Sequence, residues 1–144
     1  ELREFLRRVL GLEKLFCFVD PIAKHPYSIM KEGHYFPWHF DGNEFTVSIL
    51  IQEAEEGGLF EFVSDIRKPG DENLDSVKSI LKGSRDRVRS LKLKPMDMQL
   101  FKGHYSLHRL TRVRGKINRI IALPSYTLHP GMMNRPDHPI QVYG

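Results

Sequence analysis

His39 and Asp41 restrict the fold of this chain more than any other pair of residues. They stand two positions apart in the segment 38–43. On an extended backbone, side chains at this spacing project from the same face of the strand, so both residues can bind one metal ion. A third ligand is then needed from elsewhere, and the fold must bring a distant segment back beside this strand. His108, in the segment 106–110, is the natural candidate.

Two histidines and one carboxylate that leave coordination positions open form the facial triad of non-haem Fe(II) oxygenases. A mononuclear zinc hydrolase can use the same donor set. Arg119 provides a second signal, because it precedes the apolar run 120–123 and lies eleven residues beyond His108. A guanidinium among apolar residues needs an anionic partner. A zinc hydrolase would leave Arg119 unexplained.

Many short strands separated by turn signals predict an antiparallel sandwich or barrel. Gly57 and Gly58 are expected to turn the strand 45–51 back into 59–63 as an antiparallel hairpin. The expected strands cover residues 27–31, 35–38, 45–51, 59–63, 88–93, 98–101, 107–113 and 117–125.

Two helical patterns flank these strands. Residues 2–10 carry apolar side chains at i, i+3 and i+4 spacing and end at Gly11, which predicts an amphipathic helix that braces a sheet. Residues 68–87 form a polar insertion with one apolar helical stripe, and we expect it to pack outside the core sheet. Pro37 cannot donate to a strand ladder, so the approach to His39 should be an edge, a bulge or a strand end.

The order and spacing of these motifs resemble the Fe(II)/2-oxoglutarate-dependent dioxygenases. His-x-Asp is followed after about seventy residues by a histidine, and about ten residues later by an arginine. Residues 56–62 resemble the Gly-Gly hairpin of that family, and residues 95–103 resemble its turn and strand ahead of the distal histidine. Residues 38–45 and 50–52 are similar to the branch that holds free-amino-acid radical halogenases and their hydroxylase relatives. The resemblance implies a mainly β fold with flanking helices around a double-stranded β-helix of the jelly-roll or cupin kind.

The resemblance also implies a ligand set for Fe(II), made of His39, Asp41 and His108. His104 competes with His108 for the distal position. The segment 106–110 resembles the Ser-Leu-His-Arg-Val of the family and favours His108.

Arg119 is implied to bind the far carboxylate of 2-oxoglutarate through two parallel charge-assisted hydrogen bonds. Arg114 and Lys116 are the nearby substitutes for this role. Three protein ligands leave two positions for 2-oxoglutarate and one for O2. The implied reaction oxidises an unactivated C–H bond and releases succinate and CO2.

Asp41 separates two outcomes within the resembled branch. The halogenases have a small residue at this position, which frees a site for chloride, whereas Asp41 implies a hydroxylase, with desaturation as another oxidative outcome. A free amino acid or similar small metabolite is the expected substrate, and a peptidyl side chain, as in prolyl hydroxylases, is the alternative. The candidate substrate contacts are His34, Trp38, Asn43 and Arg112.

Length and composition set the remaining expectations. With 144 residues and 40% hydrophobic content, residues 1–144 can form a single domain with a core. The chain starts at Glu1 inside a helical pattern, so we expect an N-terminal portion to be missing. No apolar run long enough to span a membrane is present, and a cytoplasmic protein without a membrane partner is expected. The tail 130–144 is expected to cover the site or to form a subunit contact, as in a homodimer.

The net charge of +4 comes mainly from Lys and Arg between residues 78 and 116. Basic clusters can mark nucleic-acid contacts. Here the charges are spread over a predicted helix and strands without interleaved aromatic residues, so we expect a solvated surface and no nucleic-acid partner. A non-catalytic β-helix module that binds metal or a small acid without turnover is a further alternative.

Overall fold

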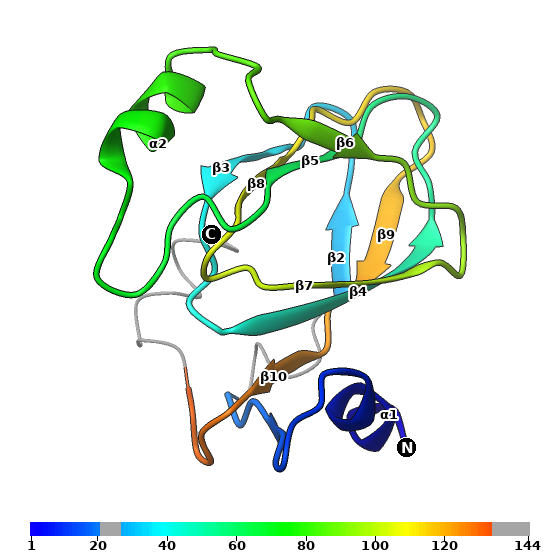
Figure 1. The fold of residues 1–144 in the computed structure, drawn as a ribbon. Coiled ribbons are helices and arrows are strands. Elements are labelled where there is room, and N and C mark those ends of the chain that lie inside the picture. Colours follow the sequence, from blue (N-terminus) through cyan, green and yellow to red (C-terminus); the bar gives the residue numbers. More distant parts are fainter. Residues whose placement is uncertain (21–26, 134–144) are drawn as a thin grey trace.

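The computed structural model describes residues 1–20 and 27–133, and within them two helices flank two antiparallel sheets (Figure 1). The helices and strands are α1 (Leu2–Val9), β1 (Phe16–Cys17), β2 (Tyr27–Met30), β3 (Phe36–His39), β4 (Phe45–Gln52), β5 (Phe60–Val63), α2 (Leu74–Leu81), β6 (Arg89–Leu91), β7 (Met98–Phe101), β8 (Leu107–Leu110), β9 (Arg119–Ala122) and β10 (Ser125–Thr127). The first sheet has the order β1-β10-β4-β9-β2, with β7 paired to β4, and the second has the order β3-β8-β5-β6.

The strand pairs are nested around the connection between β5 and β6. β5 pairs with β6, β4 with β7, β3 with β8 and β2 with β9, all antiparallel. Successive pairs alternate between the two sheets, and the pairs β4–β9 and β5–β8 join neighbouring turns. A two-stranded ribbon coiled in this way is a double-stranded β-helix. The predicted jelly-roll, cupin-like core is therefore confirmed.

Strand β4 is covered on both faces, which explains its run of buried residues. Phe45 and Val47 belong to a buried cluster with Leu6 of α1, so the predicted brace by the first helix is confirmed. Thr46 alternates to the other face, where its hydroxyl reaches Asp41. The strand thus has an apolar face toward α1 and a polar residue toward the space between the sheets.

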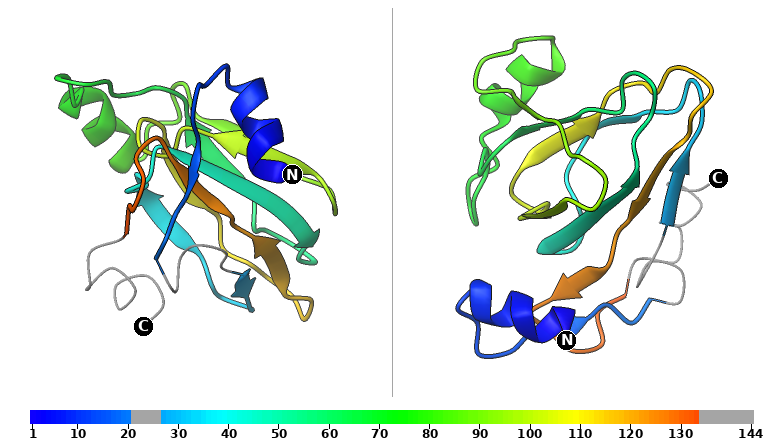
Figure 2. Two further views of the ribbon diagram at one scale, coloured as in Figure 1. Left: turned by 90° about the horizontal axis from the view of Figure 1, so that it is seen from below. Right: turned by 90° about the vertical axis from the view of Figure 1, so that its right-hand side faces the viewer.

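Helix α2 lies in the connection between β5 and β6, inside the predicted insertion 68–87. Its residue Ile80 is buried with Val63 and Leu107 from the second sheet. The helix therefore covers the outer face of that sheet, as predicted. Figures 1 and 2 show α1 and α2 at opposite ends of the molecule.

The expected hairpin between 45–51 and 59–63 is wrong, because β4 and β5 lie in different sheets. Gly57 and Gly58 serve a close approach between segments instead. A Cβ atom on Gly57 would lie 1.9 Å from the carbonyl oxygen of Arg112, and one on Gly58 would lie 2.7 Å from Cδ of Arg119. The glycines let the chain cross from one sheet to the other against these residues.

The expected strand 117–125 consists of two strands. β9 and β10 follow one another along the same side of β4, and the break contains Pro124, which has no amide hydrogen for a ladder. The expectation for Pro37 is confirmed. β3 is the edge strand of its sheet, and its register with β8 shifts between Phe36 and His39.

Two further expectations concern the C-terminal tail and membrane-spanning segments. Most of the tail 130–144 lies outside the described residues, so its role stays a prediction. Among the described residues, neither helix has the length and apolar character needed to cross a membrane.

The burial of Ile80 leads to a stability prediction. Ile80→Ala should lower the free energy of unfolding by about 2–5 kcal/mol, because it leaves a cavity between α2 and the second sheet. Leu81→Ala is the matched control, since Leu81 is 56% exposed. Urea denaturation of both variants measures the difference. Equal losses would contradict the packing of α2 on this sheet.

Candidate metal centre

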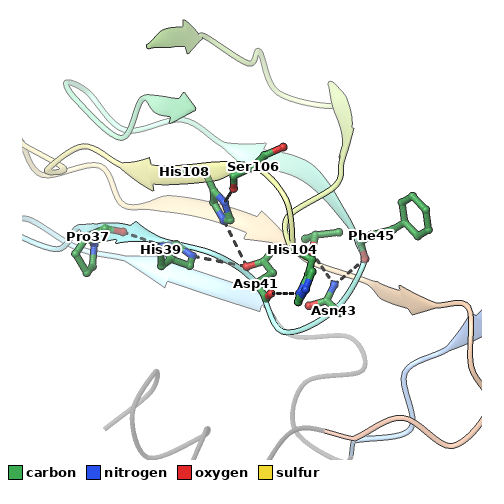
Figure 3. A network of polar contacts seen from close by, with 9 residues as sticks. Pro37, His39, Asp41, Asn43, Phe45, His104, Ser106 and His108 are labelled. Atoms are coloured by element: carbon green, nitrogen blue, oxygen red, sulfur yellow. Dashed lines mark hydrogen bonds and ion pairs between the residues drawn. The ribbon is translucent and has the colours of Figure 1, made fainter. Parts of the chain in front are cut away.

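The pairing of β3 with β8 brings two histidines together. His39 and His108 are register partners, and their ring centroids lie 4.2 Å apart. Asp41 follows His39 on the same face, and its Oδ1 lies 3.7 Å from His39 Nε2 and 3.4 Å from His108 Nε2 (Figure 3). Ligand atoms bound to one ion at about 2.1 Å are roughly 3 Å apart. The three side chains could therefore hold a metal ion.

Both imidazole rings are oriented by the backbone. Nδ1 of His39 lies 2.8 Å from the carbonyl oxygen of Pro37, and Nδ1 of His108 lies 2.8 Å from that of Ser106. When Nδ1–H donates to these carbonyls, Nε2 keeps its lone pair. Metal-binding histidines are commonly held in this way. Both Nε2 atoms thus point toward Asp41, so each can donate to its carboxylate when it carries a proton and can bind a cation when it does not.

Asp41 is fixed by its neighbours and stays anionic. The Thr46 hydroxyl donates to Oδ2 at 2.8 Å, which leaves Oδ1 on the side of the histidines. Burial raises the pKa of Asp41, but the hydrogen bond and charge of His108, the charge of His39 and the Thr46 hydroxyl outweigh it, so the pKa lies below its ordinary value. Gly103 gives Asp41 room, because a Cβ there would lie 1.9 Å from Oδ2.

Gly103 was missed as a site residue by sequence reasoning, which placed it only in a turn-and-strand segment. A glycine requirement that arises from contact with a distant side chain leaves no local pattern. His104, the competing ligand, lies beside Asp41 with Nδ1 3.2 Å from its carbonyl oxygen, and it is not part of the His-Asp-His group.

The centre is open on one side. The side chain of His39 is 39% exposed, that of Asp41 is 17% exposed and that of His108 is 5% exposed. Phe60 and Phe101 pack against the ring of His108, with centroids 5.6 and 5.0 Å away. The site thus has an apolar wall around His108 and access beside His39.

A charged network supports the two ligand strands from outside. Glu61 accepts hydrogen bonds from Arg85 and from Arg109, the residue after His108, at 2.6 to 2.9 Å. The Arg109 guanidinium lies 4.8 Å from the ring centroid of Trp38, the residue before His39. Hydrogen bonds from Arg85 and Arg109 hold the pKa of Glu61 below its ordinary value. Trp38 therefore belongs to this outer network and faces away from the metal centre.

The other candidate substrate contacts lie apart from the ligands or are already engaged. Asn43 donates to the carbonyl oxygen of Phe45 at 2.7 Å and to the Thr46 hydroxyl at 2.8 Å, and so supports Asp41 indirectly. His34 is exposed. Arg112 is also exposed, and its guanidinium lies over the ring of Tyr35.

Arg119 is buried in the interior from β9, with 6% of its surface exposed. Burial lowers its pKa from the ordinary value to about 10. Within residues 1–20 and 27–133, no hydrogen bond or ion pair to its guanidinium is present. It lines a cavity of about 310 Å³ with Leu50, Leu91 and the loop 53–59. A second cavity, of about 250 Å³, is lined by Phe60 and Phe101 near His108, and Leu91 lines both cavities.

Comparison with known families decides the assignment. Residues 1–138 match the family model described as Halogenase D. The chain belongs to the Halogenase D family. No curated protein matches this Halogenase D chain. A cupin-2 domain-containing protein from Shewanella frigidimarina NCIMB 400 is similar in structure, with a TM-score of 0.35 and 11% identity over 83% of this chain and 91% of that chain. That likeness is too distant to bear on the fold, which rests on the strand pairing.

The ligand geometry leads to a metal-binding prediction. His108→Ala should weaken Fe(II) binding by more than about 100-fold. Loss of a residue that only hydrogen-bonds a metal ligand typically weakens metal binding by about 10–100-fold. His104→Ala removes only a contact with the backbone of Asp41, so it should change the affinity by less than about tenfold. Anaerobic calorimetric titration with Fe(II) compares the two. A larger loss of Fe(II) affinity in His104→Ala than in His108→Ala would show that His104, and not His108, is the distal ligand.

Proposed function

We propose that this protein is an Fe(II)- and 2-oxoglutarate-dependent dioxygenase that hydroxylates a C–H bond of a free amino acid or similar small metabolite. The observation that carries the proposal is Arg119, a buried guanidinium without a partner among the described residues, in the same interior as the His-Asp-His group. Membership of the Halogenase D family supports the iron chemistry.

The donor set fits Fe(II). Two imidazoles and one carboxylate, with no thiolate, suit a mononuclear non-haem iron, and their grouping on one side leaves other coordination positions for small molecules. His39, Asp41 and His108 would hold the metal. The backbone carbonyls that orient the two rings and the Thr46 hydroxyl that orients the carboxylate supply the outer contacts such sites need.

The environment of Arg119 fits a dicarboxylic cosubstrate. The fall of its pKa to about 10 corresponds to roughly 3 kcal/mol of unfavourable burial at neutral pH. A carboxylate bound through two parallel hydrogen bonds would offset that cost. The cavity beside Arg119 and the cavity lined by Phe60 and Phe101 share Leu91 as a lining residue, so the two cavities adjoin.

Each part of the chain then has a defined task. With iron, 2-oxoglutarate and O2 bound, the centre supplies the oxidising power that converts C–H to C–OH while 2-oxoglutarate is split into succinate and CO2. Arg119 would hold the far carboxylate, and Phe60 and Phe101 would exclude water around His108. The primary substrate would approach beside His39, whose side chain is 39% exposed.

Asp41 is the reason for proposing hydroxylation in a member of the Halogenase D family. Its carboxylate points toward the two histidines and occupies the third ligand position. The halogenases that the sequence resembles have a small residue there, which leaves room for chloride. With Asp41 as a ligand, chloride would have no free position on this side of a bound metal.

The role of Arg119 is tested by anaerobic titration of the Fe(II)-loaded protein with 2-oxoglutarate, followed through the visible charge-transfer band of a chelated 2-oxo acid. The parent should develop the band. Arg119→Met should raise the Kd for 2-oxoglutarate roughly 100-fold or more, because it removes one partner of a buried charge pair. The ligand-free variant should be at least as stable as the parent, since the buried charge is gone.

Arg114→Met is the matched control, because Arg114 is a nearby exposed arginine that should not affect the titration. Fe(II) binding without a band in the parent would contradict the proposed cosubstrate. It would favour a module that binds metal without turnover.

The role of Asp41 is tested with chloride. Asp41→Gly leaves two histidine ligands, so chloride should shift the charge-transfer band of this variant in the presence of 2-oxoglutarate. The parent band should not respond to chloride at the same ionic strength, with sulfate as the salt control. A chloride response in the parent would argue for halogenation instead.

A further inference from the structure

Gln99 has an unsatisfied amide in the interior. Its Oε1 is inaccessible to solvent and has no hydrogen-bond partner in the part of the chain that the structure describes. Buried polar groups are normally paired, and an unmade hydrogen bond costs free energy. The oxygen and nitrogen of an amide can be exchanged by rotation, so the group can offer either a donor or an acceptor.

The side chain of Gln99 faces the space between the sheets. Phe101, two residues later on β7, packs against His108, so the same face of β7 carries both residues. Leu100 alternates outward to the cluster that contains Leu6 of α1. Gln99 lines the cavity of about 250 Å³ together with Phe60, Phe101 and Leu91.

Along β4, the register position of Gln99 lies between the positions that lead to the metal centre and to Arg119, and β7 and β9 flank β4 on opposite sides. On β4, Thr46 pairs with Phe101 and binds Asp41, so this register position marks the metal end. Ser48 pairs with Gln99 one step further along the same face of β4.

The next inward-facing residue of β4 is Leu50, which lies close to Arg119. Leu50 pairs with Ile121 of β9, and Arg119 lies two residues before Ile121 on the same face of that strand. Leu50 also lines the cavity that contains Arg119. A ligand that enters the cavity lined by Phe60 and Phe101 and extends toward Arg119 would therefore lie beside Gln99.

We infer that Gln99 is a positioning residue for the cosubstrate, and that its amide hydrogen-bonds the bound 2-oxo acid between its two ends. The inference rests on the proposed function. An amide suits this place because it can donate to a carboxylate or keto oxygen without adding charge. A carboxylate in its place would repel the acid.

The test uses the intact protein and two substitutions, Gln99→Met and Gln99→Glu. Gln99→Met removes the hydrogen bond and should raise the Kd for 2-oxoglutarate about tenfold in the anaerobic Fe(II) titration. Gln99→Glu keeps the shape, and the repulsion should raise the Kd further. Fe(II) binding should be unchanged in both, and the Tm of ligand-free Gln99→Met should equal or exceed that of the parent, because an unpaired buried amide is gone.

Gln52→Leu is the control, since Gln52 is an exposed glutamine on β4 whose amide bonds the carbonyl oxygen of Asn118. A charge-transfer band in the parent with an unchanged Kd in Gln99→Met overturns the inference alone. A lower Tm of Gln99→Met with an unchanged Kd also overturns the inference, and it indicates that Gln99 only stabilises the fold. Absence of the band in the parent overturns both the inference and the proposed function. If Gln99→Met does not fold, Gln99→Glu tests the inference instead. A raised Kd for 2-oxoglutarate with unchanged Fe(II) binding supports the inference, and an unchanged Kd overturns it.

Discussion

The antiparallel register between β3 and β8 is the constraint on which the site depends. It sets His39 directly opposite His108 on the inner face. Their neighbours in the chain, Trp38 before His39 and Arg109 after His108, meet on the outer face. A slip of one residue would turn every side chain of either strand to the other face. The contacts of Glu61 with Arg109 and Arg85 oppose such a slip, so a network on the outer face helps to hold the His-Asp-His group in place without touching it.

The interior of the molecule carries two polar groups that the described chain leaves unpaired, the guanidinium of Arg119 and the amide oxygen of Gln99. Each lowers the stability of the empty fold, and apolar residues of similar size would remove that cost. Both lie on inward positions of the first sheet. Their joint presence is explained most simply by one polar ligand in the space between the sheets.

Local patterns predicted much of this arrangement. The offset between His39 and Asp41, and a charged Arg119 beside an apolar run, are visible in sequence because each depends on residues close in the chain. The hairpin after β4 was mispredicted because Gly57 and Gly58 are needed for close contact with Arg112 and Arg119, which lie far away in sequence. The contact between Trp38 and Arg109 could not be predicted either, because it depends on the register between β3 and β8. The fold followed from nearby strands and turns, whereas the contacts around the site depend on long-range pairing.

The nested ribbon also sets an order for folding. Closing a loop costs more entropy as the loop lengthens, so strands near the tip of the ribbon, β5 and β6, can pair first, and each further pair closes only a short additional loop. The insertion with α2 lengthens the loop between β5 and β6 and so raises the entropy cost of closing it. The contacts of Ile80 with Val63 and Leu107 offset this cost, because they pack α2 against β5 and β8. On this path the metal ligands meet only when the third pair forms, and Arg119 reaches the interior with the last. A chain in which only the first two pairs have formed would therefore have neither the His-Asp-His group nor the buried Arg119 in place.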